Sequence, residues 1–341
     1  MKYPILHLDL NIEKYDTPDS LDNILDKSLT AWEKLYGAEP SERSFSLRFA
    51  GIIERACKQA GQRVVILVDE YDKPMLQAIG NEELQRQFRN ALKPFYGALK
   101  TMDGCIKFAF LTGVTKFGKV SVFSDLNNLD DISMRKDYVE LCGVSDRELH
   151  DTLDAELHEF ADVRGVTYDK LCAELKECYD GYHFTHNSIG MYNPFSLLNA
   201  FKYKEFGSYW FETGTPTYLV SLLKKHHYDL ERMAHEETDA QVLNSIDSES
   251  TNPIPVIYQS GYLTIKGYDE EFGIYRLGFP NREVEEGFVR FMLPYYANVN
   301  KVESPFEIQK FVREVRSGDY DSFFRRLQSF FADTTYEVIR D

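Results

Sequence analysis

Hydrophobic positions in the N-terminal part of the chain alternate between strand-like runs and helix-like spacing. The segment Tyr3–Leu10 predicts a strand, and the aliphatic runs Val64–Glu70 and Ile106–Thr112 predict two more. Because the last two runs lack polar alternation, we expect strands buried on both faces of a parallel sheet beneath helices. Helical spacing between the runs predicts three helices: one opening at Thr17 and Pro18, one over Ser44–Ala60, and one starting near Asn81.

The pattern changes after Cys142. Ser145 and Glu148 form a capping-box pattern at the start of a helix. Helical spacing then dominates as far as the acidic segment 226–250, which predicts an exposed linker or a solvated helix. Two alternating runs within Gly261–Pro280 predict a hairpin, and helices on either side would complete a winged-helix-like unit. We therefore expect three parts: an α/β core over 1–143, a helical lid region over 144–250, and a winged-helix-like and C-terminal helical region over 251–341.

Charge and composition narrow the classes of partner. The 55 acidic and 39 basic side chains give a formal net charge of −16, which opposes binding of nucleic acid by the surface as a whole. No run of residues has the length and apolar character of a membrane span. The five cysteines form no C-x-x-C pair, which is typical of reduced thiols in a cytoplasmic protein.

Candidate chemistry lies at the end of the first long aliphatic run. Asp69 and Glu70 follow four or five aliphatic residues, which is the Walker B pattern of ATP hydrolases. In that pattern the aspartate holds Mg²⁺ and the glutamate polarises the attacking water. The alternative is a strand end with two solvated carboxylates and no chemistry.

A second motif competes for the role of nucleotide site. The stretch GVTKFGKV, Gly113–Val120, has the G-x-x-x-x-G-K spacing of a phosphate-binding loop and follows an apolar run. The next position should be Ser or Thr to hold Mg²⁺, but it is Val120, which cannot coordinate a cation. We therefore interpret this match as a coincidence.

Several longer motifs together resemble the AAA-ATPase-like family, and the resemblance extends over nearly the whole chain. Members are bacterial proteins with a P-loop ATPase core, and many carry a C-terminal nuclease-like domain of the PD-(D/E)XK superfamily. The motifs are LVDEYDKP (Leu67–Pro74), FLTGVTKF (Phe110–Phe117), FSDLNNLDDIS (Phe123–Ser133), ECYDGYHF (Glu177–Phe184), MYNPFSLLNAF (Met191–Phe201) and YWFETGTPTYLV (Tyr209–Val220).

The resemblance implies a P-loop NTPase-like sheet, with ATP and Mg²⁺ as cofactors of the full-length protein. Asp69 would bind the metal and the cofactor, and Glu70 would be catalytic. The sensor residue that contacts the γ-phosphate or the water would be Thr112, with Thr115 as the second choice. The phosphate-binding loop would precede the strand at Tyr3, so we expect the chain to be a central piece that lacks both this loop and the nuclease-like domain.

Two classes of function remain open. The first is an ATPase-type module whose nucleotide chemistry requires residues outside this chain. The second is a non-catalytic interaction or DNA-associated module that uses the winged-helix-like region, with a protein or nucleic-acid partner. Asp69 and Glu70 favour the first class, because a scaffold without chemistry has no need of two carboxylates at a buried strand end.

Overall fold

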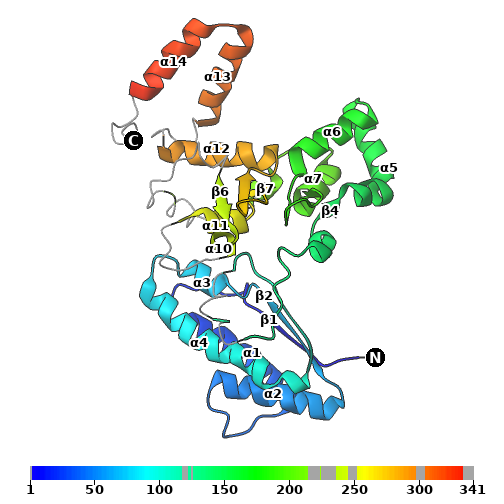
Figure 1. Ribbon diagram of the computed structural model, residues 1–341, viewed down its shortest axis with the longest axis vertical. Helices are drawn as coiled ribbons and strands as arrows, with labels where there is room; N and C mark the ends of the chain where they lie inside the picture. Colours follow the sequence, from blue (N-terminus) through cyan, green and yellow to red (C-terminus); the bar gives the residue numbers. More distant parts are fainter. Residues whose placement is uncertain are drawn as a thin grey trace.

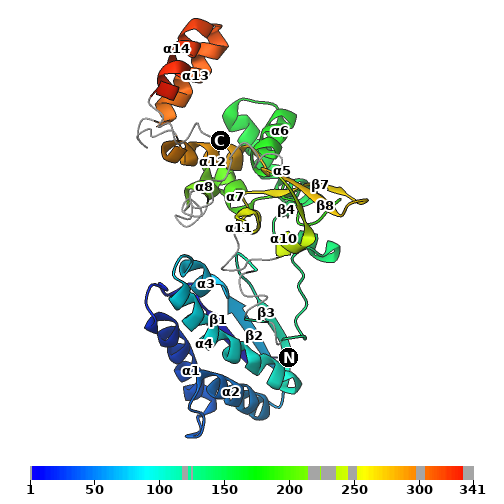
Figure 2. The same ribbon diagram turned by 60° about the vertical axis from the view of Figure 1, so that its left-hand side comes forward.

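The N-terminal unit is built on a three-stranded parallel sheet. In this computed structural model, residues 2–116, 122–123, 126–213, 223, 236–244, 252–296 and 304–332 are described. Strands β1 (Ile5–Asp9), β2 (Val64–Asp69) and β3 (Ile106–Leu111) pair in the order β1–β2–β3 (Figure 1 labels β1 and β2, and Figure 2 labels all three). The predicted parallel pairing, with Val64–Asp69 at the centre, is confirmed.

Helices cover one side of this sheet, as Figure 2 shows for α1, α2 and α4. The Ser44 hydroxyl accepts a hydrogen bond from the Leu47 N–H, 3.3 Å away, to begin α2, which ends at the left-handed Gly61. The Asn81 side chain begins α4 in the same way. The helices of this unit are α1 (Asp19–Tyr36), α2 (Phe45–Ala60), the short α3 (Lys73–Gln77), α4 (Glu82–Thr101) and the 3₁₀ helix η1 (Asp103–Cys105).

The expectation that the aliphatic strands are buried on both faces is wrong for the described residues. The register places Ile5, Val65 and Phe108 in one row across the sheet. Ile5 is 56% exposed and Phe108 is 54% exposed, whereas Leu6 and Leu8 on the opposite face of β1 are buried. The reason is that the described helices form a layer on one face only, so the apolar side chains of the other face have no covering partner.

A helical unit follows the α/β unit. Ser145 and Glu148 form the predicted capping box at the start of α5. Buried leucine and aromatic side chains of α5, α6 and α7 form a core of their own. The elements are η2 (Lys136–Leu141), β4 (Val144–Ser145), α5 (Asp146–Arg164), α6 (Tyr168–Tyr179), β5 (Met191–Tyr192), which is antiparallel to β4, α7 (Pro194–Tyr203) and α8 (Tyr209–Glu212).

The predicted hairpin is confirmed and belongs to a larger antiparallel sheet. Strands β7 (Thr264–Asp269) and β8 (Ile274–Gly278) pair, and β6 (Glu237–Asp239) pairs with the other side of β8. The expectation of a linker or a solvated helix over 226–250 is therefore wrong for β6, because Thr238 is buried opposite Tyr275. Residues 224–235 and 245–250 lie outside the described part. Helices α10 (Ala240–Asn244), α11 (Ile254–Gln259) and α12 (Arg282–Tyr296) surround the sheet.

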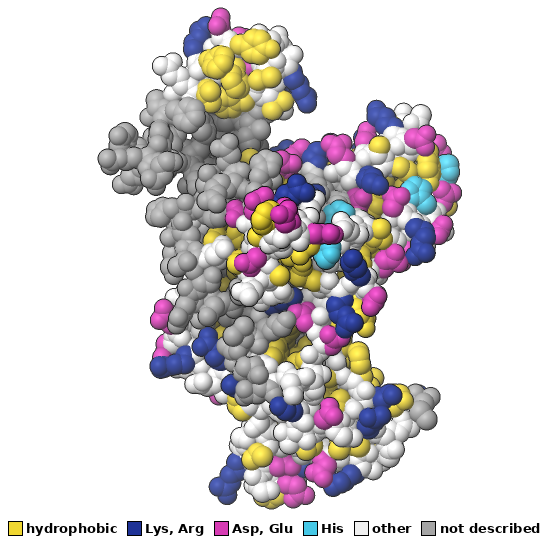
Figure 3. Space-filling model, viewed as in Figure 1, with side chains coloured by type: hydrophobic (Ala, Val, Ile, Leu, Met, Phe, Trp, Pro, Cys, Tyr) yellow, Lys and Arg dark blue, Asp and Glu magenta, His cyan; other side chains and the backbone are white. Residues whose placement is uncertain are grey.

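A helical hairpin of α13 (Ser304–Ser317) and α14 (Tyr320–Ala332) projects from α12, away from the α/β unit (Figures 1 and 2). An ion pair of 2.7 Å between Arg326 Nη2 and Glu314 Oε1 joins the two helices. Exposed hydrophobic side chains gather on the hairpin in Figure 3, among them Val312, Val315 and Phe324. No helix within the described ranges is long and apolar enough to cross a membrane.

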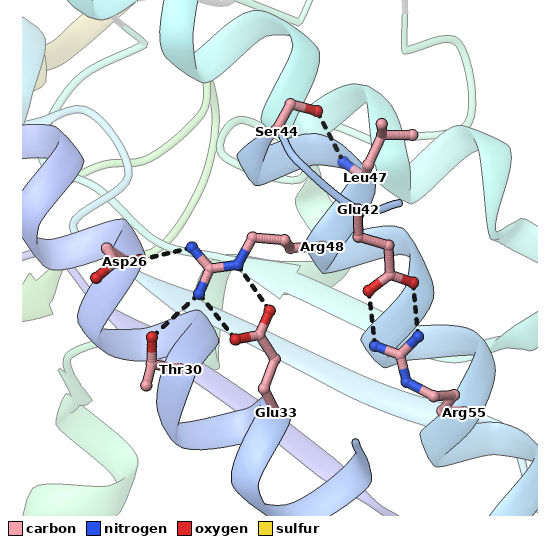
Figure 4. A network of polar contacts seen from close by, with 8 residues as sticks. All are labelled: Asp26, Thr30, Glu33, Glu42, Ser44, Leu47, Arg48 and Arg55. Atoms are coloured by element: carbon pink, nitrogen blue, oxygen red, sulfur yellow. Dashed lines mark hydrogen bonds and ion pairs between the residues drawn. The ribbon is translucent and has the colours of Figure 1, made fainter. Parts of the chain in front are cut away.

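Helices α1 and α2 are joined by the guanidinium of Arg48 (Figure 4). Its Nε and Nη2 donate to the two carboxylate oxygens of Glu33 at 2.6 and 2.9 Å, and Nη1 donates to Asp26 Oδ1 at 2.6 Å. Nη2 also lies 3.0 Å from the Thr30 hydroxyl. Because the Arg48 and Glu33 side chains are only 15% and 16% exposed, solvent screens this pair weakly.

We predict that Arg48→Ala lowers the free energy of unfolding of the α/β unit by about 1–3 kcal/mol, because it leaves a partly buried carboxylate without its donors. Urea unfolding followed by Trp32 fluorescence in a Trp210→Phe background would measure this. The matched control is Arg86→Ala, whose exposed pair with Glu83 should contribute less than about 1 kcal/mol. Equal effects of the two substitutions would contradict the prediction.

Candidate functional site

The carboxyl ends of the three parallel strands bring together an acid and a hydroxyl. Asp69 ends β2, and Thr112 directly follows β3. The Thr112 N–H donates to the Val68 carbonyl at 2.9 Å, and its hydroxyl donates to Asp69 Oδ1 at 2.6 Å. Ligands of open α/β sheets bind at this edge. Asp69 is exposed, so its carboxylate is accessible there.

Glu70 has an unusual backbone conformation. Its φ is +57°, a left-handed value that is rare for a residue with a side chain. This turn sends the chain from β2 into α3, and the Glu70 carbonyl accepts from the Lys73 N–H at 3.0 Å. Burial, followed by the negative charges of Glu13, Asp9 and Glu70, raises the pKa of Tyr15.

Asp9 at the end of β1 was not singled out from the sequence. It is the direct register partner of Asp69, so the two acids lie beside each other at the sheet edge. Its Oδ1 accepts from the Asn11 N–H at 2.8 Å, and Lys73 Nζ donates to the Asn11 carbonyl at 2.8 Å. The sequence feature that could have identified Asp9 is its position as an acidic residue at the end of a predicted strand, which it shares with the Asp-Glu pair of β2.

The buried acid of the site is Asp72, three residues after Asp69. Its side chain accepts from the Thr115 N–H and hydroxyl, both at 2.6 Å, and from the Val114 N–H at 3.2 Å. Burial raises the pKa of Asp72 to about 6 despite these donors. Only glycine fits at position 113, because a Cβ there would lie 2.4 Å from Asp72 Oδ1. Asp72 therefore shapes the loop that follows β3.

The hydrogen bonds to Asp69 and Asp72 distinguish the two predicted sensor residues. Thr115 is buried and its hydroxyl is directed to Asp72, whereas its carbonyl accepts from the Tyr71 hydroxyl at 2.7 Å. Thr112 is the residue that contacts Asp69. The structure thus places Thr112 against Asp69 and Thr115 against Asp72.

The described part of GVTKFGKV, Gly113–Lys116, is a turn with no helical residue. The Lys116 N–H donates to Gln259 Oε1 at 2.5 Å, and Lys116 Nζ contacts Asn244 Oδ1 and Asp131 Oδ2 at 2.5 and 2.9 Å. Phe117–Val120 lie outside the described residues. In the described half of the motif, the backbone N–H and the side-chain ammonium of Lys116 thus make hydrogen bonds and an ion pair within the protein.

Asp69 offers a carboxylate oxygen for a cation. Mg²⁺ is commonly bound by one or two carboxylates together with substrate phosphates and water. Among the residues that the structure describes, no group of three His, Cys, Asp or Glu side chains could hold a metal ion. Asp69 thus supplies one carboxylate of the kind that binds Mg²⁺ together with phosphate oxygens.

The N-terminal unit is therefore an α/β unit with an open parallel sheet and an acid–threonine pair at adjacent strand ends. Residues 1–123 match the model of the AAA-ATPase-like family, described as "Predicted AAA-ATPase". A curated relative, "Uncharacterized protein in vnfD 5'region" of Azotobacter chroococcum mcd 1, is 35% identical over 298 residues. The alignment covers 86% of this chain and 55% of the relative, so the chain spans about half the length of that protein. No solved structure matches the chain.

We predict that Asp72→Asn removes a pH dependence of stability. With a pKa of about 6 in the folded state and an ordinary value when unfolded, Asp72 binds its proton more tightly in the native protein. Its contribution is therefore fully present below about pH 4 and is lost as the pH rises through about 6, a change of about 3 kcal/mol.

Urea unfolding of both proteins between pH 4 and 7.5 would test this sign. The difference in unfolding free energy, native chain minus Asp72→Asn, should fall with rising pH. The exposed Asp137→Asn is the control and should run parallel to the native chain. A difference that stays constant, or grows with pH, would contradict the raised pKa.

Proposed function

We propose that this chain carries the metal-binding and water-activating part of an ATP hydrolase. The observation that carries the proposal is the 2.6 Å hydrogen bond from Thr112 to Asp69 across two adjacent parallel strand ends. Asp69 would hold Mg²⁺, which supplies charge neutralisation at the phosphates. Glu70 would polarise the attacking water, and Thr112 would contact the γ-phosphate or that water.

The contacts of each residue support this division of roles. The Thr112 hydroxyl fixes one oxygen of Asp69, so the carboxylate is held in a single orientation at an accessible edge. Glu70 takes a left-handed backbone conformation directly after Asp69, so the two residues do not continue one regular strand. In the proposed mechanism Asp69 acts on the cation, whereas Glu70 accepts a proton from water.

We further propose that the phosphate-binding loop is supplied by polypeptide outside these 341 residues. The bare apolar face of the sheet, with Ile5 and Phe108 more than half exposed, supports this because parallel sheets are normally covered on both faces. β3 is an edge strand of the described sheet and offers a free edge for a further strand. A PD-(D/E)XK nuclease-like domain would likewise lie beyond the chain.

We predict that the 341-residue chain alone binds ATP only weakly and does not hydrolyse it measurably. A phosphate-binding loop contributes several charge-assisted hydrogen bonds, each about 1.5–3 kcal/mol, and their loss would weaken a micromolar site past millimolar. Isothermal titration with Mg-ATP and a phosphate-release assay would measure both quantities. In a longer protein that includes the upstream strand, loop and helix, binding should return, and Glu70→Gln should retain ATP without turnover.

Two results would contradict this mechanism. Micromolar ATP binding by the 341-residue chain that Lys119→Ala abolishes would show that GVTKFGKV is a phosphate-binding loop after all. Equal hydrolysis rates for the longer protein and its Glu70→Gln variant would exclude Glu70 from water activation. The control is Glu13→Gln, a carboxylate whose charge also acts on Tyr15.

The alternative is a DNA-associated module that uses the winged-helix-like region. The antiparallel order β6–β8–β7, with α10 and α11 before the hairpin, is the observation that favours it. The turn of the hairpin carries Asp269, Glu270 and Glu271, which would repel phosphates from the part that usually approaches DNA. Because of the negative charge of this turn, we consider the DNA-associated module less well supported than the ATPase module.

If this region does bind DNA, its affinity should fall steeply with salt, because counterion release dominates such binding. Fluorescence anisotropy with a labelled duplex, titrated from 20 to about 200 mM salt, would measure the slope. Replacing Glu270 and Glu271 by Gln should strengthen any true interaction. No binding at the lowest salt would remove this alternative for the chain.

A further inference from the structure

The loop Thr112–Lys116 is bonded to the α/β unit along its length. The Thr112 carbonyl accepts from the Tyr71 N–H at 2.9 Å, next to the bond between its hydroxyl and Asp69. Asp72 then holds the N–H groups of Val114 and Thr115. A displacement at one end of this loop cannot be absorbed between its residues without breaking one of these bonds.

The last residue of the loop bonds to the other side of the molecule. The Lys116 N–H and Nζ reach the side chains of Gln259 on α11 and Asn244 on α10, each at 2.5 Å. Lys116 Nζ also pairs with Asp131 at 2.9 Å. The Lys116 side chain is only 13% exposed, so its charge depends on these oxygen atoms for stabilisation.

Helix α11 belongs to two hydrophobic cores. Val256 packs into the core of the α/β unit, whereas Ile254 and Ile257 pack into the core of β7, β8 and α12. Gln259 Nε2 donates to the Leu243 carbonyl at 2.6 Å, which ties α11 to α10. Among the described residues, contacts of the pair α10–α11 with the α/β unit include the apolar side chain of Val256 and the bonds to Lys116.

We propose that Lys116 is a positioning residue that couples α10–α11 to the Asp69–Thr112 pair at the strand ends. A shift of α10–α11 is carried through Gln259 and Lys116 to Thr115, and from there along the loop to Thr112. The effect on ATP turnover rests on the function proposed above, whereas the coupling itself is a property of this chain without nucleotide. Coupling between two sites is reciprocal, which makes it testable from either end.

Amide hydrogen exchange of the 341-residue chain tests the coupling in both directions. Gln259→Ala should raise exchange at Val114 and Thr115 as well as at Lys116, by roughly tenfold, as expected from the loss of one net hydrogen bond. Thr115→Val, which removes only the hydroxyl bond to Asp72, should raise exchange in Ile254–Gln259. The control is Thr101→Val, whose hydroxyl donates to the Gly97 carbonyl within α4 and should change neither segment.

Exchange that rises only on the substituted side would overturn the proposal, because it would show two independent local contacts. If circular dichroism shows that Gln259→Ala does not fold, Lys116 variants provide a second test. Lys116→Met should raise amide exchange on both sides, and Lys116→Arg should keep exchange on both sides as low as in the native chain. A failure of Lys116→Arg to restore either side would also count against the proposal. In the longer protein, two-sided exchange without ATPase activity would reject the proposed function and leave the coupling intact.

Discussion

The candidate site depends on the hydrogen bonds that the buried carboxylate of Asp72 accepts. This carboxylate accepts three hydrogen bonds from Val114 and Thr115, and its position requires glycine at residue 113. These bonds hold the loop after β3 against the end of β2. Thr112 is thereby placed beside Asp69 at one end of the loop, and Lys116 is placed against α10–α11 at the other. One buried acid thus organises both the strand-end pair and the contact between units.

Within the described part of the chain, helices cover the sheet on one face. Three helices bury the inner side chains of β1 and β2, whereas Ile5 and Phe108 remain open on the other face. The strand-end pair lies at an edge with access from solvent, but the described loop has no row of free N–H groups for a triphosphate.

Local elements of the fold were predictable because their signals span only a few residues. Caps at Ser44 and Asn81, the capping box of Ser145 and Glu148, and the hairpin within Gly261–Pro280 all follow from neighbouring side chains. Strand β6 was not predictable, because three residues with acidic neighbours become a strand only when β8 offers them an edge. The prediction that the sheet is buried on both faces was wrong for a similar reason. The aliphatic composition of a strand does not determine how many layers of helices pack on the sheet.

The sequence by itself determined the parallel α/β character of the N-terminal unit and placed Asp69 and Glu70 at a strand end. The partners of these residues were decided by tertiary structure. The family resemblance ranks Thr112 first and Thr115 second as the sensor residue, but it does not give their partners. Strand register directs Thr112 to Asp69, and the loop directs Thr115 to Asp72, 43 residues away. The bond from Lys116 to Gln259 joins residues 143 positions apart. Such contacts depend on how strands align and how helices pack, and neither is encoded in the few residues around each side chain.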